Sequence, residues 1–385
     1  MKMKTIATPD MLPLESFITE YKDINMGNKY RPVAVGKYGI RTRESIYSKE
    51  LAKDYSKNKL IYKDTLTVGM GSVQIDIGVL SDDVIYSVSP AYHTYKIKGI
   101  NSLYLRYCLQ CRNSDMFNRF AKRGSRQGKT IDLKRWLKYE IPVYDIKTQE
   151  EIVYRLEKVL NLIELRKHQL QQLDELVKSR FIEMFGDPEK NPKGWSKEIL
   201  CNHLNVIGGY AFKSELFAED GIPVLRIGNI NSGFFQPINM VYWKQDDSLS
   251  RYMMYAGDLV MSLTGTVGKD DYGNVCILGD DYDCYYLNQR NAKLELFKSL
   301  DKYYLSQILK FPAIKKKLTG ISRGVRQANI SNKDILNLEI PIPPIDLQNE
   351  FATFVEQNDK SKVVVQKALD EAQTLFDSLM QEYFG

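Results

Sequence analysis

The sequence has little of what marks several protein classes. Its 385 residues include only five cysteines, too few and odd in number for a disulfide framework. No apolar run approaches the roughly 20 residues that a membrane-spanning helix requires. The opening residues, MKMKTIATPD, lack the apolar core of a signal peptide. Three histidines, widely separated, offer no metal cluster. We therefore expect a cytosolic protein.

No sequence motif indicates a catalytic or cofactor-binding site. GSRQGKT (124–130) resembles a phosphate-binding loop, but three residues stand between its glycines instead of four, and the related segment GVRQANI (324–330) lacks the Gly-Lys pair. Cys108 and Cys111 form a C-x-x-C with no second pair and no nearby histidine, which favours structural thiols. Asp280, Asp281 and Asp283 indicate a solvent-exposed acidic turn rather than a nuclease site. The sequence predicts no catalytic residue, no metal and no cofactor.

The net charge of +6 is unevenly distributed. Residues 1–147 carry 26 basic and 15 acidic side chains, whereas residues 186–346 carry 19 of each and residues 347–385 carry 3 and 7. A concentrated positive excess is typical of a surface that binds a polyanion. In the neutral part, such contacts must therefore come from local clusters.

An internal repeat organises the chain. RGSRQGKTIDLKRWLKYEIPVYDIKTQEE (123–151) recurs as RGVRQANISNKDILNLEIPIPPIDLQNE (323–350), and the register then continues without a gap to Phe-Gly at 185–186 and 384–385. A period this long is typical of a duplicated domain with an attached helix rather than of a solenoid. The order along the chain is variable domain, repeat helix, variable domain, repeat helix.

Each repeat ends in a long helix with a heptad-like apolar seam. An extended Ile-Pro segment precedes a run without Gly or Pro, and apolar residues then recur at steps of four and three. The first copy has Ile152, Leu156, Val159, Ile163, Leu170, Leu173 and Val177, and the second has Phe351, Val355, Val365, Leu369, Ala372, Phe376 and Leu379. Helices of about 38 residues, or roughly 57 Å, can pair antiparallel and hold the two domains at a fixed separation. Two ordinary core helices are the alternative.

The variable domains show short strand-like runs over 30–98 and 204–296, followed by helical stretches at 101–122 and 300–318. The predicted fold class is α+β. It comprises two domains, each with a twisted β-sheet plus helices, which are separated by two long antiparallel coiled-coil helices in a pseudo-twofold repeat.

Several segments carry a family resemblance. These are IPVYDIKTQEEI (141–152), IPIPPIDLQNEF (340–351), LVKSRFIEMFGD (176–187), GGYAFKSELF (208–217), PVLRIGNI (223–230), GDLVMSLTGTVG (257–268) and LNQRNAKL (287–294). With the domain–helix–domain–helix order, the chain resembles the specificity subunits of type I restriction-modification systems. The resemblance implies target-recognition domains at 1–147 and 187–346 and spacer helices at 148–186 and 347–385.

The resemblance also implies a function and partners. Each target-recognition domain would read one half of a bipartite site in double-stranded DNA, and the coiled coil would measure the spacer. Two modification subunits, which bind S-adenosylmethionine and methylate adenine, would dock on this scaffold, and restriction (motor-nuclease) subunits would join them in the prokaryotic cytoplasm, with no membrane contact. A coiled-coil adaptor that binds only protein and a stand-alone DNA-modifying enzyme remain the alternatives.

Base contacts favour Arg, Lys, Asn or Gln on rigid loops, and phosphate contacts favour Arg, Lys, Ser, Thr and amides near glycine. In the first domain the candidates of these types are Lys37, Tyr38, Arg41, Arg43, Ser72, Arg123, Arg126 and Gln127. In the second they are Lys213, Arg226, Asn229, Thr264, Thr266, Arg290, Arg323, Arg326 and Gln327. Because Arg-Gly-x-Arg-Gln occurs in both halves, we expect it to position the DNA backbone or brace the domain rather than read sequence.

Overall fold

The chain divides into two compact units. The structure is a computed structural model that describes residues 8–36, 39–45, 54–123, 129–266, 269, 271–320 and 327–385, without the side chains of Arg123 and Gln327. Unit 1 comprises residues 1–168 together with 366–385, and unit 2 comprises residues 169–365. Each unit therefore joins one variable domain to a segment of both long helices.

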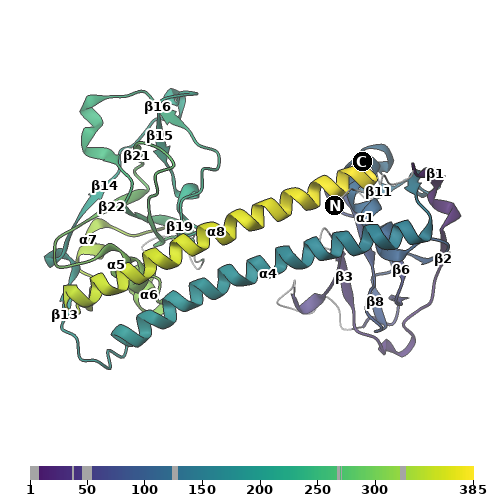
Figure 1. Cartoon of the computed structure of the whole chain (residues 1–385), viewed down its shortest axis with the longest axis horizontal. Helices are drawn as coiled ribbons and strands as arrows, with labels where there is room; N and C mark the ends of the chain where they lie inside the picture. The colour runs from purple at the N-terminus through teal and green to yellow at the C-terminus, as the bar shows by residue number, and fades with distance from the viewer. Residues whose placement is uncertain are drawn as a thin grey trace. The chain divides into compact units, whose positions relative to one another are not determined.

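The two long helices are the largest elements (Figure 1). They are α4 (Ile146–Phe185) and α8 (Ile345–Phe384), of 40 residues each. In unit 1, Ile152 near the start of α4 shares a core with Phe376 near the end of α8. In unit 2, the rings of Phe181 near the end of α4 and Phe351 near the start of α8 lie 5.5 Å apart. The helices therefore run antiparallel, and the predicted coiled-coil architecture is confirmed.

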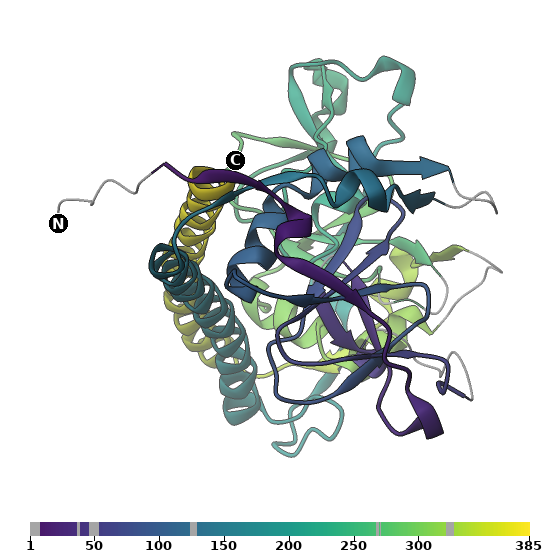
Figure 2. The ribbon, with the colours of Figure 1, turned by 90° about the vertical axis from the view of Figure 1, so that its right-hand side faces the viewer.

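Unit 1 is built on a four-stranded antiparallel sheet of order β2-β9-β6-β7, coloured purple to blue in Figure 2. Its strands are β2 (Ile18–Tyr21), β6 (Thr65–Met70), β7 (Ile75–Val79) and β9 (His93–Ile97). Two small strand pairs accompany it, namely β3 (Val33–Gly36) with β4 (Gly39–Thr42) and β5 (Lys59–Ile61) with β8 (Tyr86–Val88).

Unit 2 repeats this topology with a sheet of order β14-β22-β18-β20, also antiparallel throughout. Its strands are β14 (Leu204–Gly208), β18 (Leu259–Ser262), β20 (Val275–Ile277) and β22 (Asn291–Leu296). The sequence predicted one sheet in this domain, but the structure has a second four-stranded sheet, β16-β15-β21-β17. It consists of β15 (Ile222–Leu225), β16 (Tyr242–Trp243), β17 (Met253–Met254) and β21 (Tyr285–Leu287). The run GIPVLRIGNI, which contains β15, was expected to be strand-like, but its partners of two or three residues are too short to indicate a second sheet.

Each predicted helical stretch after the strands is two short helices. They are α1 (Ser102–Cys111) with α2 (Asn113–Phe120), and α5 (Lys302–Leu309) with α6 (Pro312–Thr319). Pro312 lacks the N–H that would continue α5, so a new helix begins there. The side chains of Asn101 and Asp301 cap α1 and α5 in equivalent fashion by accepting from two backbone N–H groups each.

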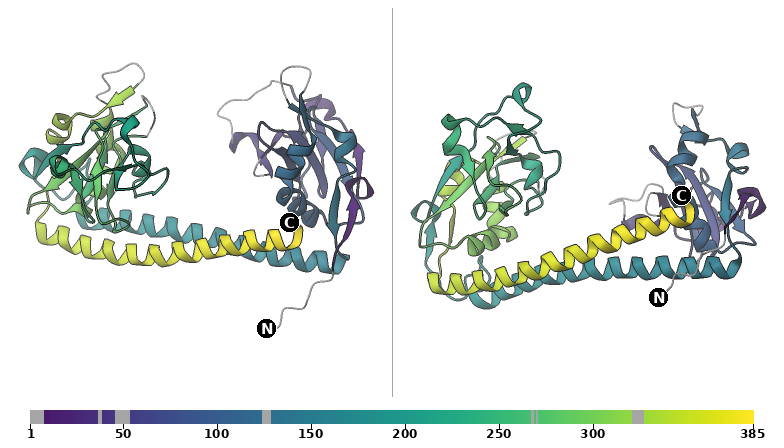
Figure 3. Two further views of the ribbon diagram at one scale, coloured as in Figure 1. Left: turned by 90° about the horizontal axis from the view of Figure 1, so that it is seen from above. Right: turned by 45° about the horizontal axis from the view of Figure 1, so that its top comes forward.

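The remaining short elements close each domain. In unit 1 they are β1 (Asp10–Pro13) paired with β12 (Glu140–Val143), β10 (Ala121–Arg123) paired with β11 (Lys129–Ile131), and α3 (Leu133–Trp136). In unit 2 they are β13 (Lys197–Ile199) paired with β24 (Glu339–Pro341), β19 (Thr264–Thr266) paired with β23 (Gln327–Asn329), and α7 (Asn332–Leu336). In each unit of Figure 3, left, β10–β11 and β23 lie at the end away from that unit's helix segments.

The repeated residues build the junction between domain and helix. The buried Gln149 accepts from the Asn101 N–H through Oε1 at 2.8 Å and donates to the Tyr144 carbonyl at 2.7 Å. Gln348 makes the same pair of bonds in unit 2, to the Asp301 N–H at 2.9 Å and the Pro343 carbonyl at 2.8 Å. The repeat is therefore a structural device that fixes each domain on its helix.

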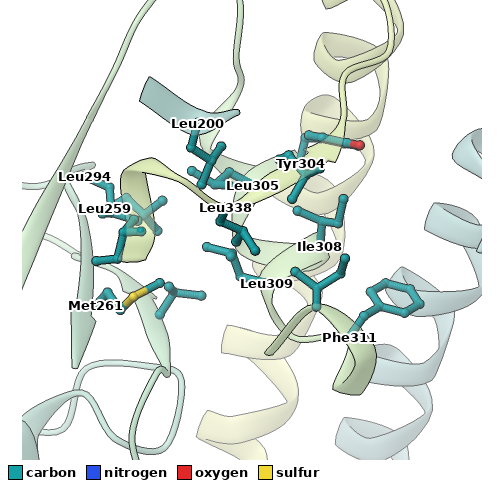
Figure 4. Close-up of a cluster of buried hydrophobic side chains, with 14 of the residues drawn as sticks. Leu200, Leu259, Met261, Leu294, Tyr304, Leu305, Ile308, Leu309, Phe311 and Leu338 are labelled. Carbon is teal, nitrogen blue, oxygen red and sulfur yellow. The ribbon is translucent and has the colours of Figure 1, made fainter. Parts of the chain in front are cut away.

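Each unit has its own hydrophobic core between the sheet, the short helices and the long helices. Figure 4 shows part of the core of unit 2, where Leu259 and Leu294 from the sheet meet Leu305 and Ile308 from α5. The core of unit 1 holds the buried Cys108, and burial raises the pKa of its thiol to about 12. This agrees with the expectation of a structural thiol.

Candidate nucleic-acid interface

Five predicted residues of the second domain gather around two adjoining clefts in unit 2. One cleft, of about 460 Å³, is rich in amides, and we call it the amide cleft; it is lined by Phe212, Phe217, Arg226, Ile227, Gly228, Asn229, Ile238, Asn239, Asn288, Gln289 and Arg290. The other, of about 380 Å³, we call the threonine cleft; it is lined by Ile227, Asn231, Thr264, Gly265, Thr266, Asp271 and Arg290. Because Ile227 and Arg290 line both, the clefts form one continuous polar surface.

Asn229 shapes the amide cleft from within. Its side chain is 1% exposed, and its Nδ2 donates to the carbonyls of Gln236 at 3.0 Å and Ile238 at 2.9 Å. Its Oδ1 accepts from the Arg226 N–H at 3.0 Å. The Asn229 amide group therefore uses its donor and acceptor to stabilise the loop that follows β15. That geometry favours a positioning role for Asn229 over direct contact with a ligand.

The turn at Asn288–Arg290, between β21 and β22, carries two exposed polar side chains, Gln289 and Arg290. The Gln289 N–H donates to the Tyr210 carbonyl at 2.9 Å, and the Arg290 carbonyl accepts from the Leu263 N–H at 2.8 Å. Gly209 lies so close that a Cβ there would stand 2.1 Å from the Asn288 carbonyl oxygen. The turn is therefore held on both sides, so Gln289 and Arg290 project from a rigid support.

A third cleft in unit 2 is basic. It measures about 330 Å³ and is lined by Lys310, Lys315 and Lys316 together with Asn274. Lys315 Nζ donates to Asn274 Oδ1 at 2.6 Å, and Asn274 Nδ2 donates to Asn231 Oδ1 at 2.9 Å. Asn231 lines the threonine cleft, so hydrogen bonds connect the two sites. This is a local cationic cluster of the kind that the neutral segment 186–346 requires, although none of these lysines was among the predicted residues.

In unit 1 the described candidates fall in two places. Lys129 Nζ donates to the Ser72 carbonyl at 2.9 Å, which joins the β6–β7 turn to β11 beside the predicted Arg123. Arg41 instead lines a cleft of about 850 Å³ between the β3–β4 pair, α1 and the long-helix segments of this unit. The Arg43 guanidinium stacks 5.1 Å from the Tyr55 ring centroid.

The other candidates are only partly described. Lys213 is exposed beside Phe212, and the Gln327 backbone pairs with Thr266 in the β19–β23 ladder. The remaining ones lie outside the described residues, namely Lys37, Tyr38, Arg126, Gln127, Arg323 and Arg326, as does the side chain of Arg123.

Within the described ranges, no group of three or more His, Cys, Asp or Glu side chains could hold a metal ion. None of the helices described combines the length and apolarity needed to cross a bilayer. Two sheet domains, each joined to paired long helices, with cationic and amide-lined clefts on one of them, are features of a multidomain nucleic-acid-binding protein.

Comparison with known proteins agrees with that class. The model of the type I restriction modification DNA specificity domain matches residues 17–175 and 192–372. The chain therefore belongs to the family of type I restriction-modification DNA specificity proteins.

Two relatives and one solved structure illustrate the likeness. The type I restriction enzyme MjaVIII specificity subunit of Methanocaldococcus jannaschii is 26% identical over 301 residues, which cover 71% of this chain and 68% of the relative. The EcoAI specificity subunit of Escherichia coli is 26% identical over 232 residues, but this match covers only 39% of that relative. The crystal structure of the type I S subunit from M. genitalium has the same fold, with a TM-score of 0.56 at 15% identity, over 100% of this chain and 98% of that one.

Proposed function

We propose that each variable domain reads one half of a bipartite DNA sequence and that α4 and α8 set the length of the spacer between the halves. The observation that carries this proposal is the duplication itself. Both units contain the same sheet order and the same glutamine-braced junction to a long helix. Two equivalent readers in one chain suit a site with two separated halves. We keep 1–147 and 187–346 as the reading domains and 148–186 and 347–385 as the spacer helices.

The clefts of unit 2 suit different kinds of DNA contact, to phosphates in one case and to bases in the other. The exposed Lys316 of the basic cleft is suited to a phosphate oxygen, and phosphate contacts supply affinity without sequence information. The exposed Gln289 and Arg290 on their rigid turn are suited to base edges. In unit 1, the β10–β11 pair with Ser72 and Lys129 is the corresponding candidate.

The partners in this proposal are two methyltransferase subunits, one for each unit. Apolar side chains on the long helices remain exposed within each unit. In unit 1, Tyr154 is 59% and Leu165 53% exposed, and in unit 2, Val363 and Val364 are each 69% exposed. Apolar patches of this kind suit protein partners. Motor-nuclease subunits complete the assembly in the prokaryotic cytoplasm. This chain recognises the DNA sequence and acts as the scaffold, and it catalyses no reaction itself.

Methylation-aware genome sequencing tests the proposal. The chain is expressed with the methyltransferase subunits of its own system in a host that lacks adenine methylation. We expect a motif in two parts separated by a spacer of constant length, and no methylation when this chain is omitted. A contiguous motif, or methylation without sequence preference, would reject the division into two half-sites.

Two further measurements address the alternatives. Purified chain that methylates or cuts DNA without partners would establish an enzyme. The absence of salt-dependent DNA affinity would favour a protein-only adaptor. A DNA-binding protein that neutralises phosphates shows a binding constant whose logarithm falls linearly with the logarithm of the salt concentration.

A further inference from the structure

The threonine cleft contains an acidic group, which is unusual for a surface facing DNA. The Asp271 carboxylate lines this cleft, and its Oδ1 accepts from the Thr266 N–H at 2.8 Å. This bond from the Thr266 backbone, with a further one from its hydroxyl, lowers the pKa of Asp271 below its ordinary value. The carboxylate is therefore ionised near neutral pH. A phosphate placed beside it would meet like-charge repulsion, so the cleft suits a base edge better than the DNA backbone.

Arg290 also lines this cleft. Its backbone is held by the Leu263 N–H and by the Asn288 side chain, which accepts from the Arg290 N–H at 3.2 Å. The side chain itself is exposed. Among the described residues, nothing hydrogen-bonds or ion-pairs with the Arg290 guanidinium, and Arg290 and Asp271 do not pair with each other. Both charged groups therefore stay open to a ligand.

One polar atom beside the cleft has no partner among the described residues. The Thr264 hydroxyl oxygen is buried and makes no hydrogen bond within them. Buried polar atoms are nearly always paired, but this oxygen is closed off from solvent, so a group bound in the open cleft pairs with it only if the cleft wall moves. Asn231, which also lines the cleft, is held in place because its Oδ1 accepts from Ser262 Oγ at 3.3 Å and from Asn274 Nδ2 at 2.9 Å.

We propose that the threonine cleft reads one G·C base pair in the major groove, with Arg290 donating to guanine O6 and N7 and Asp271 accepting from the cytosine N4 amino group. This inference rests on the proposed function and identifies what one of its surfaces reads. Arginine is the usual bidentate partner of guanine, and a carboxylate can accept from cytosine N4. In an A·T pair adenine keeps the N7 acceptor but replaces O6 by an amino donor, so the arginine loses one of its two bonds, and thymine O4 faces the carboxylate with a second acceptor, which is repulsive.

The test uses the chain in complex with its methyltransferase subunits and the sequence motif found by methylation sequencing. Binding is measured for a panel of duplexes in which each base pair of both half-sites is replaced in turn. For the unaltered complex, replacing the G·C pair read by Arg290 weakens binding about 5- to 150-fold. In Arg290→Ala this penalty falls at that pair alone, and what remains is the contribution of Asp271. Arg290→Lys retains part of the penalty lost in Arg290→Ala, because lysine keeps the charge but not the planar fork of the guanidinium.

Two further variants sharpen the result. Asp271→Asn keeps the oxygen that accepts from the Thr266 N–H but replaces the other oxygen by a donor, so the preference for G·C over A·T falls at the same pair. Arg251→Ala removes an exposed positive charge from unit 2 outside the three clefts and leaves every penalty unchanged.

Three outcomes overturn the inference. Arg290→Ala could weaken all duplexes alike and reduce the salt slope by about 0.9, which is the signature of one phosphate contact. The base pair whose replacement penalty falls in Arg290→Ala could be an A·T pair. Alternatively, the variant could leave the penalty at every pair unchanged. In each of these cases the unaltered complex still discriminates among duplexes, and the proposed function stands. If the unaltered complex shows no discrimination at any pair, the proposed function itself fails.

Discussion

Replacing Gln348 by alanine tests the idea that the repeated residues hold each domain on its helix. Gln348 is fully buried, with 0% of its surface exposed. Its Oε1 accepts from the Asp301 N–H at 2.9 Å, and its Nε2 donates to the Pro343 carbonyl at 2.8 Å. Alanine removes both partners and leaves a buried donor and a buried acceptor without hydrogen bonds.

The magnitude follows from those two orphaned groups. Each buried, unsatisfied polar group costs about 1–3 kcal/mol, so we expect Gln348→Ala to lower the free energy of unfolding of unit 2 by about 2–6 kcal/mol. Gln149→Ala should cost unit 1 a similar amount, because Gln149 makes the equivalent bonds to Asn101 and Tyr144. Gln357→Ala is the matched control, since Gln357 is exposed on α8 and makes no side-chain bond to a domain within the described residues.

The assay is amide hydrogen exchange followed by mass spectrometry, because a chain with two units need not unfold in one step. Protection of α5 should fall in Gln348→Ala and protection of α1 in Gln149→Ala, with the other unit unchanged. A change below about 0.5 kcal/mol, the size expected at an ordinary surface position, or one equal to that of Gln357→Ala, would refute the bracing role.

Four other predictions follow, three from the structure and one from the repeated Arg-Gly-x-Arg-Gln segment. Phe384→Ala should destabilise unit 1 by about 3–5 kcal/mol, as measured by exchange protection, because the fully buried ring packs 5.1 Å from that of Tyr104; unchanged protection of α1 would contradict it. Asn358→Leu should raise the thermal midpoint of unit 2, because both amide atoms of this buried residue lack partners, and a lowered midpoint would show that the amide is satisfied. Lys316→Gln, in the basic cleft, should weaken binding of all DNA sequences alike and reduce the salt slope by about 0.9, and a sequence-selective loss would speak against a phosphate contact. Arg326→Ala should likewise weaken binding to all DNA sequences alike, and a loss confined to one base of one half-site would contradict a role of Arg326 at the DNA backbone.

The large-scale plan of the molecule was predictable because its signals are local or repeated. Heptad spacing in α4 and α8 is a property of consecutive residues, so it indicates long paired helices before any fold is known. The repeated Arg-Gly-x-Arg-Gln and Ile-Pro segments indicate two equivalent domain–helix units in the same way. The second sheet of unit 2 was not predicted, because only β15 lies in a run that looks like a strand, and its partners of two or three residues are too short to show a periodicity.

The candidate site was predictable only in part. Arginine, threonine and asparagine near glycine were reasonable choices by type, and five of them do line the two clefts of unit 2. Composition could not distinguish Asn229, whose amide braces its own loop, from Gln289, which projects from a turn and was not among the predicted residues. The three lysines of the basic cleft were hidden by the zero net charge of their segment.

The sequence by itself therefore determined the duplication, the two long helices and their apolar seam, since each is encoded in the order of neighbouring residues. Only the tertiary structure decided which side chains share a cleft. Arg290 shares one cleft with Arg226 and the other with Thr264, all distant in sequence, because the strands next to them pair across long stretches of chain. Strand pairing depends on contacts between residues that are distant in sequence and on the packing of the whole core. No local sequence pattern therefore indicates which loops the pairing brings together.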